Sequence, residues 1–153
     1  MEKTYSESGC FKCKKWKVVC PVLTESKSLQ SENTTNKKKY KIRQKLTCES
    51  AWLIYLSTCK KCNGQYVGKS TTVFKLRHSN HKQEIKNQRG GLGHHYRGHN
   101  GCGYGNFSVI LIKQVKFKTI DFLAERKVFW QNQLRVYPEN EAKGHCYRKD
   151  KNK

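Results

Sequence analysis

The chain has 153 residues, enough for one domain with a hydrophobic core and too few for two domains of ordinary size. Only 35% of the residues are hydrophobic, and the longest apolar run, residues 107–112, is far shorter than the ~18 residues of a membrane span, which excludes a transmembrane protein. Because the first nine residues lack the apolar stretch of a signal peptide, we expect an intracellular location.

Positive charge is in large excess. The 32 Lys and Arg residues outnumber the 11 Asp and Glu residues and give a formal net charge of +21. The excess is similar in the first, middle and last thirds of the chain, so the folded body itself should be basic. A solvated surface does not need such an excess, whereas a polyanion would relieve the self-repulsion. We therefore expect nucleic acid as the partner, duplex DNA first, and a nuclear location.

The eight cysteines favour metal binding over a disulfide scaffold, because they are too sparse for the latter. Two pairs have the C-x-x-C spacing with which a tight turn can hold a tetrahedral zinc ion. The same spacing also occurs in redox motifs, and it does not assign which four thiols would share an ion. The candidate zinc ligands are Cys10, Cys13, Cys20, Cys48, Cys59 and Cys62.

The first 48 residues are predicted to be a cysteine-rich, zinc-stapled and partly disordered lead-in. Residues 24–39 are rich in Ser, Thr, Asn and Lys and cannot bury much surface. Beyond them, the apolar residues 51–57 and the segment 65–68 flank Asn63-Gly64, a pair typical of tight hairpin turns. We expect two strands joined as a β-hairpin.

A helix is predicted over residues 70–87, because Phe74, His78, His81 and Ile85 recur at helical spacing behind Ser70 or Thr71 as the N-cap. The glycine-rich residues 89–106 should form a loop. Residues 107–115 are typical of a buried strand, and residues 119–136 of a second helix that ends before Pro138.

This order of elements predicts an α+β fold in which a small three-stranded antiparallel sheet is flanked by helices. The expected organisation is the lead-in at 1–48, a compact domain at 49–141 and a basic tail at 142–153.

Two short motifs on the predicted hairpin resemble those of a known family. Ile54-Tyr55 and Tyr66-Val67-Gly68 are separated as in the GIY-YIG nuclease superfamily, with ten residues between Tyr55 and Tyr66. Leu53 stands where the family has glycine. The upstream cysteines and the run TCKKCNGQYVGKST look most like the cysteine-bearing branch of Penelope-like retroelements. By itself, either tyrosine could be an ordinary strand aromatic.

The resemblance implies a catalytic set of Tyr55, Tyr66, Arg77, His81, Glu125 and Asn140. Arg77 and His81 are one helical turn apart and share a face, so a guanidinium there could clamp a phosphate. Asn140 matches the asparagine that closes the family pattern, in a different local context. The alternative for Arg77 is an ordinary basic helix face.

Glu125 is also singled out by its neighbours. Phe122 and Phe129 lie at i−3 and i+4, and a lone carboxylate on such an apolar face would need a partner. Mg²⁺ or Mn²⁺ would satisfy it, because hard divalent cations favour oxygen ligands.

The predicted function is a divalent-metal-dependent endonuclease that hydrolyses DNA, with zinc in a structural role and no small-molecule cofactor. Two alternatives remain open: a zinc-stabilised basic module that binds nucleic acid without cutting it, and a disulfide-rich secreted protein.

Overall fold

The computed structural model describes residues 8–12, 19–87, 96 and 103–136, the side chains of residues 19 and 20 excepted. The elements in chain order are β1 (Gly9–Cys10), α1 (Val19–Val22), β2 (Ser28–Gln30), β3 (Lys39–Lys41), β4 (Lys45–Leu46), β5 (Leu53–Cys59), β6 (Gln65–Ser70), α2 (Phe74–Lys86), η2 (Tyr104–Asn106), β7 (Phe107–Gln114) and α4 (Ile120–Leu134).

An antiparallel sheet with strand order β6-β5-β7 forms the centre of the fold. The middle strand β5 pairs with β6 from Leu53↔Ser70 to Thr58↔Gln65, and with β7 from Leu53↔Gln114 to Cys59↔Phe107. Thr58 alone among the residues of β5 is not buried, as expected for a strand covered on both faces. The predicted three-stranded antiparallel sheet and flanking helices are confirmed.

The hairpin between β5 and β6 turns at Asn63-Gly64, as the sequence predicts. Asn63 has a positive φ of 63°, a conformation that asparagine tolerates well. The Cys59 N–H donates to the Gly64 carbonyl at 2.9 Å and closes the turn.

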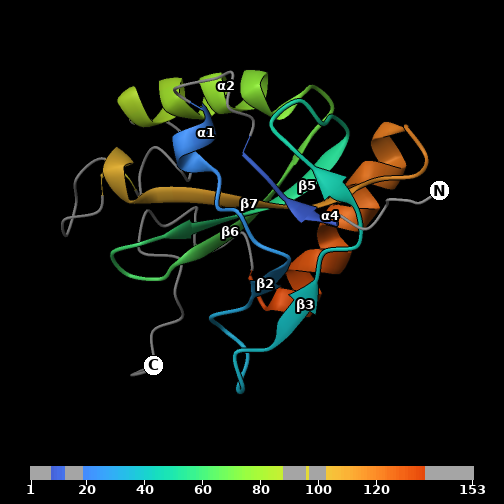
Figure 1. Cartoon of the computed structure of the whole chain (residues 1–153), viewed down its shortest axis with the longest axis horizontal. Helices are drawn as coiled ribbons and strands as arrows, with labels where there is room; N and C mark the ends of the chain where they lie inside the picture. The colour runs from blue at the N-terminus through green and yellow to red at the C-terminus, as the bar shows by residue number, and fades with distance from the viewer. Residues whose placement is uncertain (1–7, 13–18, 88–95, 97–102, 137–153) are drawn as a thin grey trace.

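Helix α2 covers one face of the sheet, and α4 with the β2–β3 pair lies on the other (Figure 1). The predicted apolar stripe of α2 is confirmed, since Phe74, His78, His81 and Ile85 are its buried residues. The predicted N-cap is wrong: the helix begins at Phe74 behind Val73, which makes no side-chain cap bond. Ser70 instead ends β6, and its hydroxyl donates to the Thr72 carbonyl at 2.8 Å in the turn that leads to the helix.

Helix α4 follows the prediction closely. The Thr119 hydroxyl caps its first turn by accepting the Phe122 N–H at 3.1 Å. At the other end Arg135 adopts the left-handed conformation with φ 60°, which terminates the helix after Leu134.

Residues 24–48 differ from the expected loose lead-in. Leu29, Ile42 and Leu46 are buried in the same hydrophobic core as the central sheet. Strand β1 pairs in parallel with β4, and the Thr24 N–H donates to the Val109 carbonyl at 2.8 Å. A few apolar residues at the right positions therefore suffice to fold this polar segment onto the domain.

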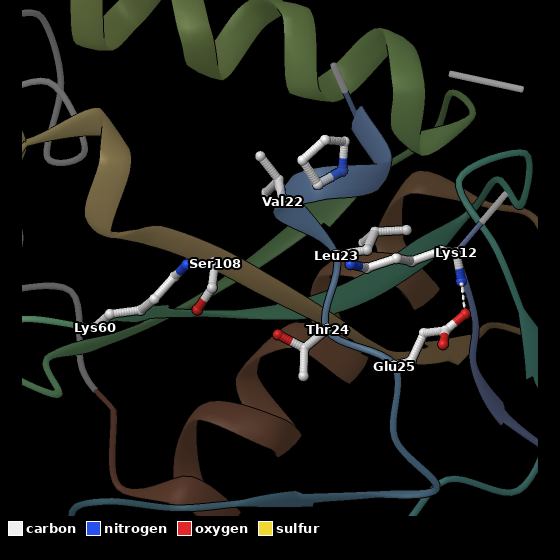
Figure 2. A pocket seen from close by; sticks show the side chains of 8 residues that line it. Lys12, Val22, Leu23, Thr24, Glu25, Lys60 and Ser108 are labelled. Carbon is white, nitrogen blue, oxygen red and sulfur yellow. Dashed lines mark hydrogen bonds between the residues drawn. The ribbon is translucent and has the colours of Figure 1, made fainter. Parts of the chain in front are cut away.

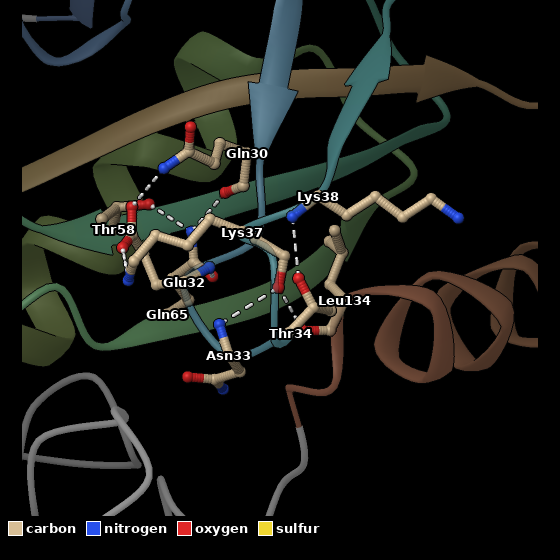
Figure 3. Close-up of polar contacts among 10 residues, drawn as sticks. Gln30, Glu32, Asn33, Thr34, Lys37, Lys38, Thr58, Gln65 and Leu134 are labelled. Atoms are coloured by element: carbon tan, nitrogen blue, oxygen red, sulfur yellow. Dashed lines mark hydrogen bonds and ion pairs between the residues drawn. The ribbon is translucent and has the colours of Figure 1, made fainter.

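Polar contacts complete that attachment (Figure 3). Gln65 of β6 donates from Nε2 to the Gln30 carbonyl at 3.0 Å and to the Thr58 hydroxyl at 3.2 Å. The Ser31 hydroxyl, which is fully buried, donates to the Leu134 carbonyl at the end of α4 at 2.7 Å. The side chains that made this segment look disordered thus serve as hydrogen-bonding groups in the fold.

The helices of the described residues are too short or too polar for any of them to span a membrane.

Candidate active site

Tyr55 lies at the centre of the candidate site. Its side chain is fully buried on the face of β5 that α2 covers, with its ring 5.5 Å from that of Phe74 and 5.5 Å from that of His81. The Tyr55 hydroxyl makes hydrogen bonds to two residues of α2, His81 through Nε2 and Arg77 through Nε. The first predicted motif and the predicted helix therefore meet at one phenolic oxygen.

Arg77 donates its Nε–H to the Tyr55 oxygen at 3.3 Å. Partial burial lowers the pKa of the Arg77 guanidinium, but the phenols of Tyr55 and Tyr66, together with Glu84, outweigh that effect and raise the pKa above its ordinary value. The side chain is half-buried, and none of its Nη groups is bonded to a described residue. The guanidinium is thus fixed at Nε, and its Nη groups remain as donors to an anion.

His81 is fully buried between the sheet and α2. Its Nε2 contacts the Tyr55 hydroxyl, and its Nδ1 lies 3.3 Å from the Glu84 carboxylate oxygen Oε1. Burial lowers the pKa of His81, helped by the nearby Arg77 charge and opposed by Glu84. The imidazole is therefore neutral at pH 7.

Tyr66 lies beside this group on the neighbouring strand β6. Its ring is 6.4 Å from the Tyr55 ring and 6.4 Å from the His81 ring. The Lys127 ammonium of α4 lies 5.7 Å from the centre of the Tyr66 ring, so α4 borders the cluster along β6. Tyr66 is half-buried, whereas Tyr55 is fully buried.

The structure brings together Tyr55, Tyr66, Arg77 and His81, the first four of the predicted residues. The sequence reasoning missed Glu84, which is three residues beyond His81 and thus one helical turn away. Its spacing from a buried histidine was the signal that could have identified it.

His78 is separate from this cluster, although it is one turn from His81. Its Nε2 bonds the Tyr104 hydroxyl at 2.8 Å, and its ring stacks on Phe107. Burial, with the nearby His81 and Lys82, lowers the pKa of His78 to about 4. Its hydrogen bond and ring contact join α2 to the start of β7.

Glu125 occupies a different environment from the one expected. It is exposed on α4; of the two neighbours behind the prediction, Phe129 is 39% exposed and Phe122 is half-buried against the core. The argument that an apolar face would force Glu125 to find a partner is therefore wrong, because water reaches the carboxylate. Within the described part of the chain, Glu125 forms no hydrogen bond or ion pair with Arg77 or His81. Asn140 lies outside the described residues.

The candidate zinc ligands are described only in part. Cys13 lies outside the described residues, as does the side chain of Cys20. Cys10, Cys48 and Cys59 are buried and Cys62 is half-buried. Burial is the main cause that raises the pKa of Cys10, to about 11, and its Sγ accepts the Leu111 N–H at 3.4 Å. Within the described part of the chain, no group of three or more potential ligands for a metal ion is present.

One pocket in the described part of the chain lies apart from the candidate site. Figure 2 shows a pocket of about 400 Å³ beside β7 whose polar lining includes Lys12, Glu25, Lys60 and Ser108. The Lys12 N–H donates to the Glu25 carboxylate there at 2.9 Å. None of the predicted site residues lines this pocket.

No protein-family model matches the chain, and no curated protein does. Among solved structures, the catalytic domain of the homing endonuclease I-TevI is similar, with 22% sequence identity and a TM-score of 0.45. The similarity covers 54% of this chain and 87% of that domain.

Proposed function

We propose that this protein is a divalent-metal-dependent endonuclease that hydrolyses phosphodiester bonds of DNA. The observation that carries the proposal is the contact of the Arg77 guanidinium with the Tyr55 hydroxyl, beside Tyr66 and His81. These are the residues that the GIY-YIG resemblance selects, and folding brings them to one face of the sheet. The net charge of +21 supplies the attraction for a polyanion.

The two tyrosines have different roles in this proposal. Tyr66 is half-buried and, once its own proton has been lost to solvent, would as the phenolate take the proton of the attacking water, a role that contributes about 10²- to 10⁴-fold in rate. Tyr55 is buried and would hold Arg77 by its Nε. The Nη donors of Arg77 would bind the scissile phosphate and stabilise its developing negative charge. Burial thus distinguishes two phenols that look equivalent in the sequence.

Glu125 is the residue that would hold Mg²⁺ or Mn²⁺, and its exposed carboxylate on the helix bordering Tyr66 suits an ion that keeps waters and binds substrate phosphate. When bound, such an ion would neutralise charge on the phosphate and on the leaving 3′ oxygen. Asn140 remains a proposed member of the site. We also propose that zinc binds the cysteines in a structural role, and that the chain derives from a Penelope-like mobile element.

Supercoiled plasmid with Mg²⁺ or Mn²⁺ tests the proposal. The protein should nick the plasmid, and EDTA, Arg77→Ala and Glu125→Gln should each abolish nicking. Arg43→Ala and Asp121→Asn are the matched controls, because both residues are exposed and lie outside the cluster. Nicking that persists in Arg77→Ala and Glu125→Gln would refute the assigned site.

Two observations favour one alternative, a zinc-stabilised basic module that binds DNA without cutting it: Glu125 is exposed, and among the described residues it forms no hydrogen bond or ion pair with Arg77 or His81. That module would show no nicking, together with an affinity for duplex DNA that falls steeply with salt. If the affinity for DNA did not change with salt, nucleic acid would be excluded as the partner in both proposals.

A further inference from the structure

Four side chains form a continuous series of hydrogen bonds across the interface between α2 and β5. Glu84 contacts His81 Nδ1, His81 Nε2 contacts the Tyr55 hydroxyl, and the Tyr55 oxygen accepts from Arg77 Nε. His81 and Tyr55 are fully buried, whereas Glu84 and Arg77 lie at the partly exposed ends. The series therefore runs through the protein from a carboxylate to the guanidinium.

The chemistry of the groups sets the direction of each bond. An ionised carboxylate has no hydrogen to donate, so His81 must carry its hydrogen on Nδ1 where it faces Glu84. The neutral imidazole then has a lone pair on Nε2, which can only accept from the Tyr55 O–H. With its hydrogen directed at His81, the Tyr55 oxygen presents a lone pair to the Arg77 Nε–H, which can only donate.

We infer that Glu84 is a positioning residue: by fixing the Nδ1–H tautomer of His81 it orients the Tyr55 hydroxyl, and through it the Arg77 guanidinium. Without Glu84, a hydrogen could settle on His81 Nε2. Tyr55 would then have to accept hydrogen bonds from both His81 and Arg77, and its own hydrogen would point elsewhere. The functional part of this inference rests on the proposed nuclease activity; the tautomer does not.

Glu84 was not among the residues that the sequence motifs selected, and nothing in the proposed cleavage needs it to touch DNA. Its carboxylate acts at the far end of the series from the Arg77 Nη groups. Glu84 orients His81 as an outer partner orients a histidine that binds a metal. In those proteins, loss of the partner costs about 10- to 100-fold in affinity or activity. We expect a decrease of kcat in that range when Glu84 is lost, with KM and the salt dependence of DNA binding little changed.

The test measures the His81 tautomer directly in the full chain. In ¹⁵N-histidine-labelled protein, His81 Nδ1 should give the shift of a protonated nitrogen and Nε2 that of an unprotonated one, with the signals assigned by their loss in His81→Gln. Glu84→Gln retains a side-chain oxygen that can accept from Nδ1–H and should keep this tautomer. Glu84→Ala should populate the Nε2–H form. Gln83→Ala, an exposed neighbour on the same helix, is the control and should leave the spectrum unchanged.

The outcomes separate this inference from the proposed function. An unchanged tautomer in folded Glu84→Ala would overturn the inference even if the wild-type protein cuts DNA. A tautomer that shifts as expected in a protein that never nicks plasmid would uphold the role of Glu84 in the hydrogen-bond series and refute the nuclease. If the protein cuts DNA, the kcat of Glu84→Ala should fall and that of Glu84→Gln should fall less; equal losses would refute the tautomer as the cause.

Discussion

Gly68 lies directly opposite Tyr55 in the antiparallel pair of β5 and β6, and the Tyr55 ring occupies the space that a side chain at position 68 would need. A Cβ built on Gly68 would lie 2.6 Å from Tyr55 Cε1, and closer still to Cζ and Oη. The glycine of the second motif is thus explained by the tyrosine of the first. The two motifs are a single packing unit, and this unit holds the Tyr55 hydroxyl against α2.

Gly68→Ala should therefore destabilise the fold. The added methyl group would displace the Tyr55 ring from a closely packed interior, a change that usually costs about 1–3 kcal/mol in the free energy of unfolding. Urea denaturation measures the loss. Gly105→Ala is the matched control because nothing lies within 4 Å of a Cβ at that position. Equal stability of the two variants would contradict the packing account.

Removal of the two hydroxyls should have different consequences. Tyr55→Phe leaves Arg77 Nε and His81 without their shared partner in a buried place and should lower the free energy of unfolding by about 1–3 kcal/mol. Tyr66→Phe should cost less stability, since water reaches this side chain, and should reduce the nicking rate by about 10²- to 10⁴-fold. Thermal unfolding and plasmid nicking are measured on both variants. A greater loss of stability in Tyr66→Phe, or a greater loss of nicking in Tyr55→Phe, would contradict the roles assigned to the two tyrosines.

The two buried histidines should make stability depend on pH. The pKa of His78 falls from 6.5 in the unfolded chain to about 4 in the fold, and that of His81 is also lowered. Below pH 6.5 the unfolded chain therefore binds more protons than the folded one. The free energy of unfolding should be highest above pH 7 and should fall as the pH drops toward 4, by at most about 1.4 kcal/mol per pH unit for His78, with His81 adding to the fall.

Urea denaturation at a series of pH values measures that slope. His78→Gln removes one of the two titrating groups and should flatten the dependence. An unchanged slope in this variant would show that His78 does not titrate differently in the folded and unfolded states.

Zinc binding is the remaining proposal that metal analysis can decide. Reduced protein should contain about one zinc ion per chain, and a chelator should lower its thermal stability, because metal bound to the folded state stabilises it. Binding at Cys10 would displace the proton of a buried thiol, so the affinity should rise with pH. A zinc content near zero would refute the ligand assignment for all six cysteines.

The sequence alone was sufficient for the three strands of the central sheet, for α2 and α4, and for much of the site. The apolar run at residues 51–57, the segment 65–68 and the Asn63-Gly64 turn predict the hairpin, and the spacing of Phe74, His78, His81 and Ile85 predicts α2 and its buried face. These signals are local, because strand and helix periods are set by backbone geometry over a few residues. The tyrosine motifs with Arg77 likewise selected residues that do meet.

Only the tertiary structure distinguished residues of one type from one another. Whether a tyrosine is buried like Tyr55 or accessible like Tyr66, and whether a glutamate supports a histidine like Glu84 or faces water like Glu125, depends on which segments pack together. The polar residues 24–48 show the same effect, since they join the core through a few distant contacts. The burial of Tyr55 and the hydrogen bonds of residues 24–48 depend on neighbours remote in sequence, which local spacing does not encode.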